Sequence, residues 1–345
     1  MLDHNDIIRN VRSVNAWFLP MTFHVTGFLL LPFLAQPKLW STAMVRDHAI
    51  RYLTPFLFAV LGYAIAFHIV VAHHEPPSTS ALIVIQAILV ADPTSLHNAT
   101  GFIVLWFLPA LLSIVLLNSL FASHSRYGRL IMIAVAVAVH PTVGGFSPLI
   151  KQSVPQGLLI ALYVLPLGFI LQAIMPWVTA SRHRLLMFGA CVALLFASWT
   201  VEHAYDIEVA TLDLPTLSNP LFTLATDASD LSFLVAAAII APLLARSSAL
   251  RLLGRYSLVI YLVHPLLYKP ILSGLLQVCT LQTLSRPHGA VLYWSGAAAS
   301  VVLVASVSLV LAMTLEAIAP VRRLVLPRNL PDSVFGGSKH SHAAH

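Results

Sequence analysis

Long apolar stretches recur along the whole chain and are separated by short polar segments. A helix that crosses the hydrocarbon layer of a bilayer needs roughly 20 predominantly apolar residues. By this criterion the pattern predicts spans near residues 17–36, 52–72, 101–122, 129–150, 157–177, 184–201, 230–245, 256–278 and 290–318. The sequence therefore predicts an all-α fold, a polytopic transmembrane helical bundle of about nine spans.

The apolar stretch 80–91 is too short for a standard span, and it could be a tenth span, a re-entrant segment or an interfacial helix. The distribution of positive charge decides between these, because Lys and Arg concentrate in cytoplasmic loops. Alternate loops hold 14 of the 19 basic residues, namely Lys38, Arg46, Arg51, Arg126, Arg129, Arg182, Arg184, Arg246, Arg251, Arg255, Arg322, Arg323, Arg328 and Lys339. A full crossing at 80–91 would break this alternation, so we place it at the outer interface and the C-terminus in the cytoplasm.

The composition supports a membrane protein and excludes a large water-soluble domain. Apolar residues make up 58% of the chain and charged residues 9%, whereas soluble domains carry about a quarter charged residues. The net charge of +6 follows from the basic loops and does not indicate a nucleic-acid partner. We expect one transmembrane domain over 1–328 and a disordered cytoplasmic tail over 329–345.

Three polar features change this picture little. Cys191 and Cys279 lack the spacing of a metal site, and we expect no metal cofactor. The stretch 202–230 carries six acidic and no basic residues, which predicts a solvated external loop. The segment HPTVGGFSP, which begins at His140, either lines a cavity as a broken helix or ends the fourth span.

Four segments resemble the acyltransferase-3 family of integral membrane enzymes, which transfer acyl groups to sugars. The most specific is LLGRYSLVIYLVHPLL, residues 252–267, which is similar to the last helix of the family's conserved pattern. Weaker similarities lie in PMTFHVTGFLL (20–30), RYLTPF (51–56) and LWFLPALL (105–112). They follow the family's order over nearly the whole chain.

The resemblance implies a family of ten spans, of which the first is almost wholly missing here. Met1-Leu2-Asp3-His4 resembles the outer end of that first span, which implies that His4 is the family histidine thought to be catalytic. The charge pattern gives a related expectation, because it places the N-terminus outside with no preceding helix. We therefore expect either a gene product that begins upstream or a truncated relative.

Two groups of residues are candidates for the chemistry. Imidazole can act as a base or a nucleophile near neutral pH, and His264 is placed near the bilayer centre. Its role is either in the site, as the resemblance implies, or structural, with Tyr261 as a partner one turn earlier. Arg46, His48 and Arg51 either attract the phosphates of cytoplasmic acyl-CoA or serve only as positive-inside residues.

The leading functional hypothesis is an O-acyltransferase in the inner membrane of a bacterium. The resemblance implies acyl-CoA as the donor, with acetyl-CoA favoured, and a sugar or exopolysaccharide acceptor such as cellulose or another secreted glycan. Expected partners are the lipid bilayer and a polysaccharide synthase complex. Two alternatives are a transporter lined by His140, His264 and Lys269, and a non-catalytic partner of polysaccharide synthesis.

Overall fold

The computed structural model describes residues 28–35, 37–70, 77–91, 93–101, 104–139, 155–204, 220–278 and 289–318. The described residues are almost entirely helical and contain no β-strand. The helices in chain order are η3 (Leu31–Leu34), α3 (Thr42–Val70), α4 (Pro77–Val90), α5 (Pro93–Thr100), η4 (Val104–Trp106), α6 (Phe107–Ala122), α7 (Arg126–Val139), α9 (Gln156–Ala180), α10 (Arg184–Ala204), α11 (Pro220–Leu244), α12 (Ser248–Val278) and α14 (Gly289–Ala317). The prediction of an all-α fold is confirmed.

Three helices of the described part are long and apolar enough to cross a bilayer: Thr42–Ile69, Gly157–Ala180 and Leu224–Leu244. Shorter apolar helices cover Ala81–Val90, Phe107–Ala122, Arg184–Ser198 and Val302–Ala317. These lengths and compositions confirm a membrane helical bundle. The count of nine spans stays a prediction, and residues 17–27 of the first span and the tail 329–345 lie outside the described residues.

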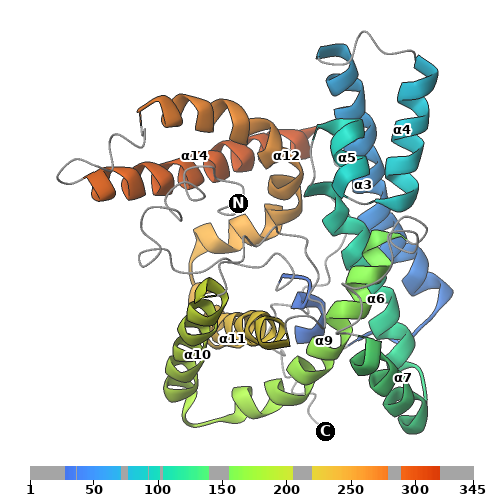
Figure 1. Ribbon diagram of the computed structural model, residues 1–345, viewed down its shortest axis with the longest axis vertical. Helices are drawn as coiled ribbons and strands as arrows, with labels where there is room; N and C mark the ends of the chain where they lie inside the picture. Colours follow the sequence, from blue (N-terminus) through green and yellow to red (C-terminus); the bar gives the residue numbers. More distant parts are fainter. Residues whose placement is uncertain are drawn as a thin grey trace, which may run out of the picture.

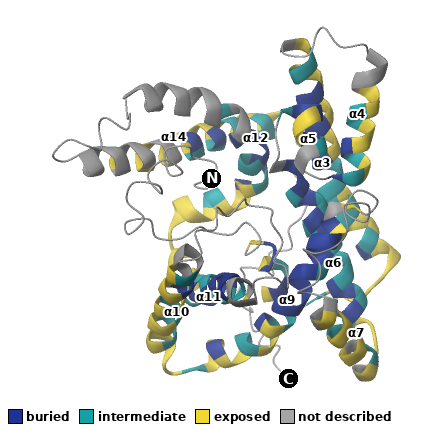
Figure 2. Cartoon of the chain, viewed as in Figure 1, coloured by how far each residue is buried: buried dark blue, intermediate teal, exposed yellow. Residues whose placement is uncertain are grey.

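Helices α6 and α9 form a closely packed pair whose facing sides are buried (Figures 1 and 2). A Cβ added to Gly157 would lie 2.8 Å from the carbonyl carbon of Pro109, so glycine permits the close approach of the two helices. Farther along the pair, the amide of Gln172 donates to Asn118 Oδ1 across 3.4 Å. Small residues and polar cross-links are the usual means by which helices associate in lipid, where burial of apolar surface gives little drive.

The expected continuous span 101–122 is wrong at its start. Gly101 has a φ of +74°, a left-handed conformation that ends α5, and α6 begins only at Phe107. Phe67 of α3 packs against Gly101, because a Cβ there would lie 2.9 Å from the Phe67 ring. Hydropathy alone did not reveal this break, since the sequence that follows the glycine, residues 102–112, is continuously apolar up to and through the start of α6.

Helices α3 and α12 begin earlier than predicted. α3 starts at Thr42 rather than 52, and α12 at Ser248 rather than 256. At 1.5 Å per residue, the 29 residues of α3 extend about 44 Å, which exceeds a hydrocarbon layer of about 30 Å. Arg46, His48 and Arg51 therefore lie on the first turns of a helix that continues beyond the apolar layer, not in a loop.

The prediction of a solvated acidic loop over 202–230 is wrong at its C-terminal end. α11 begins at Pro220, a residue suited to the first turn of a helix, and so includes Asp227 and Asp230. Asp230 is only 3% exposed, and Asp227 accepts a hydrogen bond from Tyr163 of α9. Residues 205–219 of the predicted loop lie outside the described residues.

Two polar contacts join helix ends that the charge pattern assigns to the same side of the membrane. The N–H of Trp40, just before α3, donates to Ser123 Oγ at the end of α6 over 2.6 Å. The start of α12 and the end of α14 are joined by an ion pair between Arg255 and Glu316. Each of these bonds joins two segments that the basic residues assign to the same face. Which face is cytoplasmic stays a prediction.

The segment 80–91 forms α4, a 14-residue helix that packs beside α3 and α5 (Figure 1). At about 21 Å it is shorter than the hydrocarbon layer. The start of α3 and the end of α6 lie together, so the chain between them crosses the bilayer an even number of times. Helices α3 and α6 account for two crossings, which leaves none for α4 alone. This agrees with a segment that does not cross the bilayer by itself, but Figure 1 shows α4 running alongside α3, whereas a helix in the plane of the interface would lie across it, so the interfacial placement stays a prediction.

Candidate functional site

His264 lies at the middle of α12 and is 7% exposed. Its Nδ1 is 2.6 Å from the carbonyl oxygen of Tyr261. That carbonyl would normally accept the N–H of residue 265, but residue 265 is proline and has no N–H to donate. The His-Pro sequence thus removes one backbone donor from the helix, and the imidazole supplies another in its place.

This hydrogen bond defines the chemistry of the imidazole. A carbonyl oxygen only accepts hydrogen bonds, so Nδ1 carries the hydrogen. In the neutral ring Nε2 is then the basic nitrogen, the atom that can take up a proton or an acyl group. The expected partner Tyr261 is thus present, although it acts through its backbone carbonyl rather than its hydroxyl.

The turn of α12 that carries His264 is packed against two other helices. The Tyr261 ring lies 5.2 Å from the ring of Phe107 at the start of α6. The hydroxyl of Tyr63 in α3 donates to the carbonyl oxygen of Leu262. These contacts hold the imidazole at a fixed place beside α3 and α6.

The basic cluster lies near the beginning of the same helix α3. Arg46 is exposed and lies 3.6 Å from Asp47, a neighbouring negative charge that we did not include in the predicted cluster. The His48 ring stacks on Tyr52 at 6.1 Å, and the Arg51 guanidinium lies over the same tyrosine at 5.6 Å. The buried Nδ1 of His48 has no hydrogen-bond partner among the described residues.

The structure does not place the basic residues of α3 beside His264. Arg51 and Tyr63 are twelve residues apart on α3, which is about 18 Å along the helix axis. The basic residues therefore lie near the N-terminal end of α3, whereas the His264 turn contacts the same helix at Tyr63, nearer its C-terminal end. His4 lies outside the described residues.

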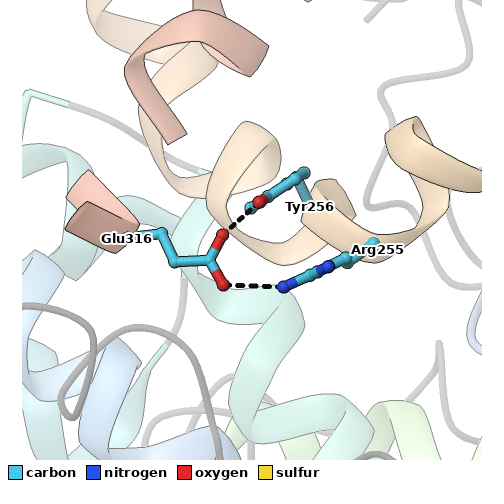
Figure 3. A network of polar contacts seen from close by, with 3 residues as sticks. All are labelled: Arg255, Tyr256 and Glu316. Atoms are coloured by element: carbon cyan, nitrogen blue, oxygen red, sulfur yellow. Dashed lines mark hydrogen bonds and ion pairs between the residues drawn. The ribbon is translucent and has the colours of Figure 1, made fainter. Parts of the chain in front are cut away.

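A polar network at the start of α12 was missed in the sequence (Figure 3). Glu316 of α14 accepts a hydrogen bond from Arg255 Nη2 at 2.8 Å and another from the hydroxyl of Tyr256. The Arg255 guanidinium also lies 5.4 Å from the centre of the Tyr256 ring. Arg255 and Tyr256 belong to the segment 252–267, and an acidic residue in the otherwise apolar α14 was the available signal for their partner.

Substituting Glu316 with alanine should lower the melting temperature of the protein. Tyr256 is 4% exposed, and an unpaired buried hydroxyl costs about 1–3 kcal/mol. The Arg255 side chain is 64% exposed, so its lost ion pair should add little. Thermal unfolding in lipid nanodiscs measures the change, with Glu316→Gln as the variant that retains two hydrogen-bonding groups. Equal melting temperatures for Glu316→Ala and the wild type would contradict the role of this network.

A second group of unpredicted polar residues lies on α11, one of which is bonded to α9. The Tyr163 hydroxyl, on a residue that is 1% exposed, donates to Asp227 Oδ1 over 2.8 Å. Thr226, Ser229, Asp230 and Ser232 of α11 are all at most 6% exposed. Carboxylates inside a membrane are costly and usually have a functional or paired role.

A model of the acyltransferase-3 family, described as an acyltransferase domain, matches residues 4–313. No curated protein matches the chain, and no solved structure does. The matched range includes the basic turns of α3, the His264 turn of α12 and most of α14. The chain therefore belongs to the acyltransferase-3 family.

Proposed function

We propose that the protein transfers an acyl group from cytoplasmic acyl-CoA to a hydroxyl of a sugar or exopolysaccharide. The observation that carries this proposal is the course of α3. Its first turns present Arg46, His48 and Arg51, and its residue Tyr63 is hydrogen bonded to the turn of α12 that holds His264. One helix thus links an anion-attracting surface to a buried imidazole.

The first turns of α3 suit the phosphates of the donor. Arginine binds phosphate oxygens through charge-assisted hydrogen bonds, and these are stronger than bonds between neutral groups. His48 is the third side chain of this proposed phosphate site, and its Nδ1 has no hydrogen-bond partner among the described residues. With the phosphates held there, the extended pantetheine arm would carry the thioester along α3 toward His264.

The imidazole supplies the acid–base step. Nε2 of His264 accepts the proton of the sugar hydroxyl while the hydroxyl oxygen forms a bond to the thioester carbonyl carbon. The carbon–sulfur bond then breaks, and the proton passes from the imidazole to the leaving thiolate, which yields an ester and CoA thiol. The resemblance implies a second imidazole, His4, and we retain it as part of this proposal.

Acetyl-CoA and a secreted glycan such as cellulose are the preferred substrates, in the inner membrane of a bacterium and beside a polysaccharide synthase. This choice rests on the resemblance to sugar-modifying relatives. Family membership also favours transfer over the transport hypothesis. Incubation of the purified protein with labelled acetyl-CoA and oligosaccharide acceptors tests the activity. Absence of label from every acceptor tried, with the folded protein in nanodiscs, would contradict it.

Substituting both Arg46 and Arg51 with alanine should raise the apparent donor KM at least about tenfold and change kcat much less. One charge-assisted hydrogen bond contributes about 1.5–3 kcal/mol, and 1.4 kcal/mol corresponds to a factor of ten. The matched control replaces Arg246 and Arg251, two exposed arginines assigned to the same membrane face. If both double variants showed the wild-type donor KM, the α3 arginines would serve topology alone.

A further inference from the structure

The N-terminal half of α11 carries several buried hydroxyl and carboxyl groups. Thr226 and Asp230 are four residues apart, so they lie on the same face of the helix one turn from each other. A helical side chain leans toward the N-terminal end of its helix, so Asp230 extends over the turn that holds Thr226. The two side chains therefore share one buried patch, and Asp227 lies at its edge.

An unpartnered hydroxyl lies in this patch. Thr226 is 6% exposed, and its Oγ1 has no hydrogen-bond partner among the described residues. Threonine inside a helix commonly bonds to the carbonyl oxygen of its own preceding turn, as Thr100 and Thr200 do here. Thr226 does not form this bond, and its buried oxygen lacks the partner that such groups nearly always have.

The carboxylate beside Thr226 is oriented by another helix. The Tyr163 hydroxyl donates to Asp227 Oδ1 over 2.8 Å and thereby fixes the carboxylate against α9. Tyr163 and Asp227 are each seven residues beyond the first residue of their helix, so the bond joins the N-terminal parts of α9 and α11. The charge pattern assigns both helix starts to the outer face, the face from which a secreted glycan would arrive.

We propose that the patch formed by Thr226, Asp227 and Asp230 binds hydroxyl groups of the sugar acceptor. This inference rests on the proposed function and names the acceptor subsite of the same enzyme. Carboxylates accept hydrogen bonds from sugar hydroxyls, and the Thr226 hydroxyl can both donate and accept. The patch is thus complementary to a polyhydroxylated ligand, and the ligand supplies the partner that Thr226 lacks.

The test uses the full chain in lipid nanodiscs, because glycoside detergents would compete as ligands. The variants are Thr226→Val, which keeps the shape and removes the hydroxyl, and Asp230→Asn. The control is Ser308→Ala on α14, since Ser308 is fully buried and its Oγ also has no described partner. A panel of methyl glycosides serves as the acceptor probe, and acetyl-CoA serves as the donor.

Thr226→Val and Asp230→Asn should each raise the acceptor KM about tenfold, with the donor KM and the control unchanged. Thr226→Ser keeps the hydroxyl and removes the methyl group, so it should show the wild-type acceptor KM. If Thr226 acted only by packing, the loss of the methyl group would raise the acceptor KM instead. Saturation-transfer NMR of glycoside binding provides a readout that needs no turnover. If glycoside binding is lost in Thr226→Val while the wild type transfers no acyl group, the subsite stands and the proposed activity falls. Unchanged binding and acceptor KM in a folded Thr226→Val variant would overturn the subsite.

Discussion

Replacing His264 with asparagine is expected to lower acyl transfer by about 10²- to 10⁴-fold, the usual contribution of a general acid–base group. The amide nitrogen of asparagine can still donate to the Tyr261 carbonyl, which His264 Nδ1 meets at 2.6 Å. The variant should therefore keep the local helix geometry while it loses the basic nitrogen. Labelled acetyl transfer to an oligosaccharide measures the loss, and thermal unfolding checks that the fold remains.

His124 offers a matched control for this substitution. Its Nδ1 lies 2.7 Å from the carbonyl oxygen of Leu120, so it makes the same kind of bond to the preceding turn. His124 is exposed at the turn between α6 and α7, away from the buried imidazole of α12. His124→Asn should retain full activity. Activity near the wild-type level in His264→Asn would show that His264 has a structural role.

Gly157→Ala should destabilise the protein by about 1–3 kcal/mol, the usual effect of inserting a methyl group into a close-packed contact. The added Cβ would lie 2.8–2.9 Å from backbone atoms of Pro109 and Ala110. Backbone atoms cannot move aside as a flexible side chain can, so α6 and α9 must separate. The shift in melting temperature, followed by tryptophan fluorescence in nanodiscs, measures this effect.

Gly189→Ala on α10 is the control, because nothing lies within 4 Å of a Cβ at that position. Alanine favours a helix over glycine by about 1 kcal/mol, so this variant should melt at the same temperature or higher. Opposite shifts for the same chemical change would establish the close contact of α6 and α9. A Gly157→Ala protein at least as stable as Gly189→Ala would refute it.

Hydropathy predicted the helices whose apolar stretches end at charged residues or turns. The bounds of α9, α10 and α14 lie within three residues of the expected 157–177, 184–201 and 290–318. The start of α11 was missed because Asp227 and Asp230 made the sequence there seem solvated. Asp230 is buried and Asp227 is half-buried, and the position of Asp227 depends on its contact with Tyr163, which is 64 residues away and so lies outside any local window of sequence.

The candidate site was predicted in parts and not as an arrangement. His264 and the basic residues of α3 follow from chemistry that each residue carries by itself. The bond between Tyr63 and the His264 turn joins residues 199 positions apart, so it depends on how the helices pack. The effect of Pro265 was readable in the sequence, because a proline always removes the donor to the carbonyl four residues earlier.

The bond between His264 and its own helix restricts how a group can travel through the membrane. If the ring turned over, Nδ1 would leave the Tyr261 carbonyl, and the helix would lose the donor that replaces the missing one of Pro265. The imidazole therefore cannot act as a swinging arm that loads on one side and unloads on the other. Under the proposed function, the donor and the acceptor must then reach the same edge of a stationary ring, or a second histidine must complete the transfer.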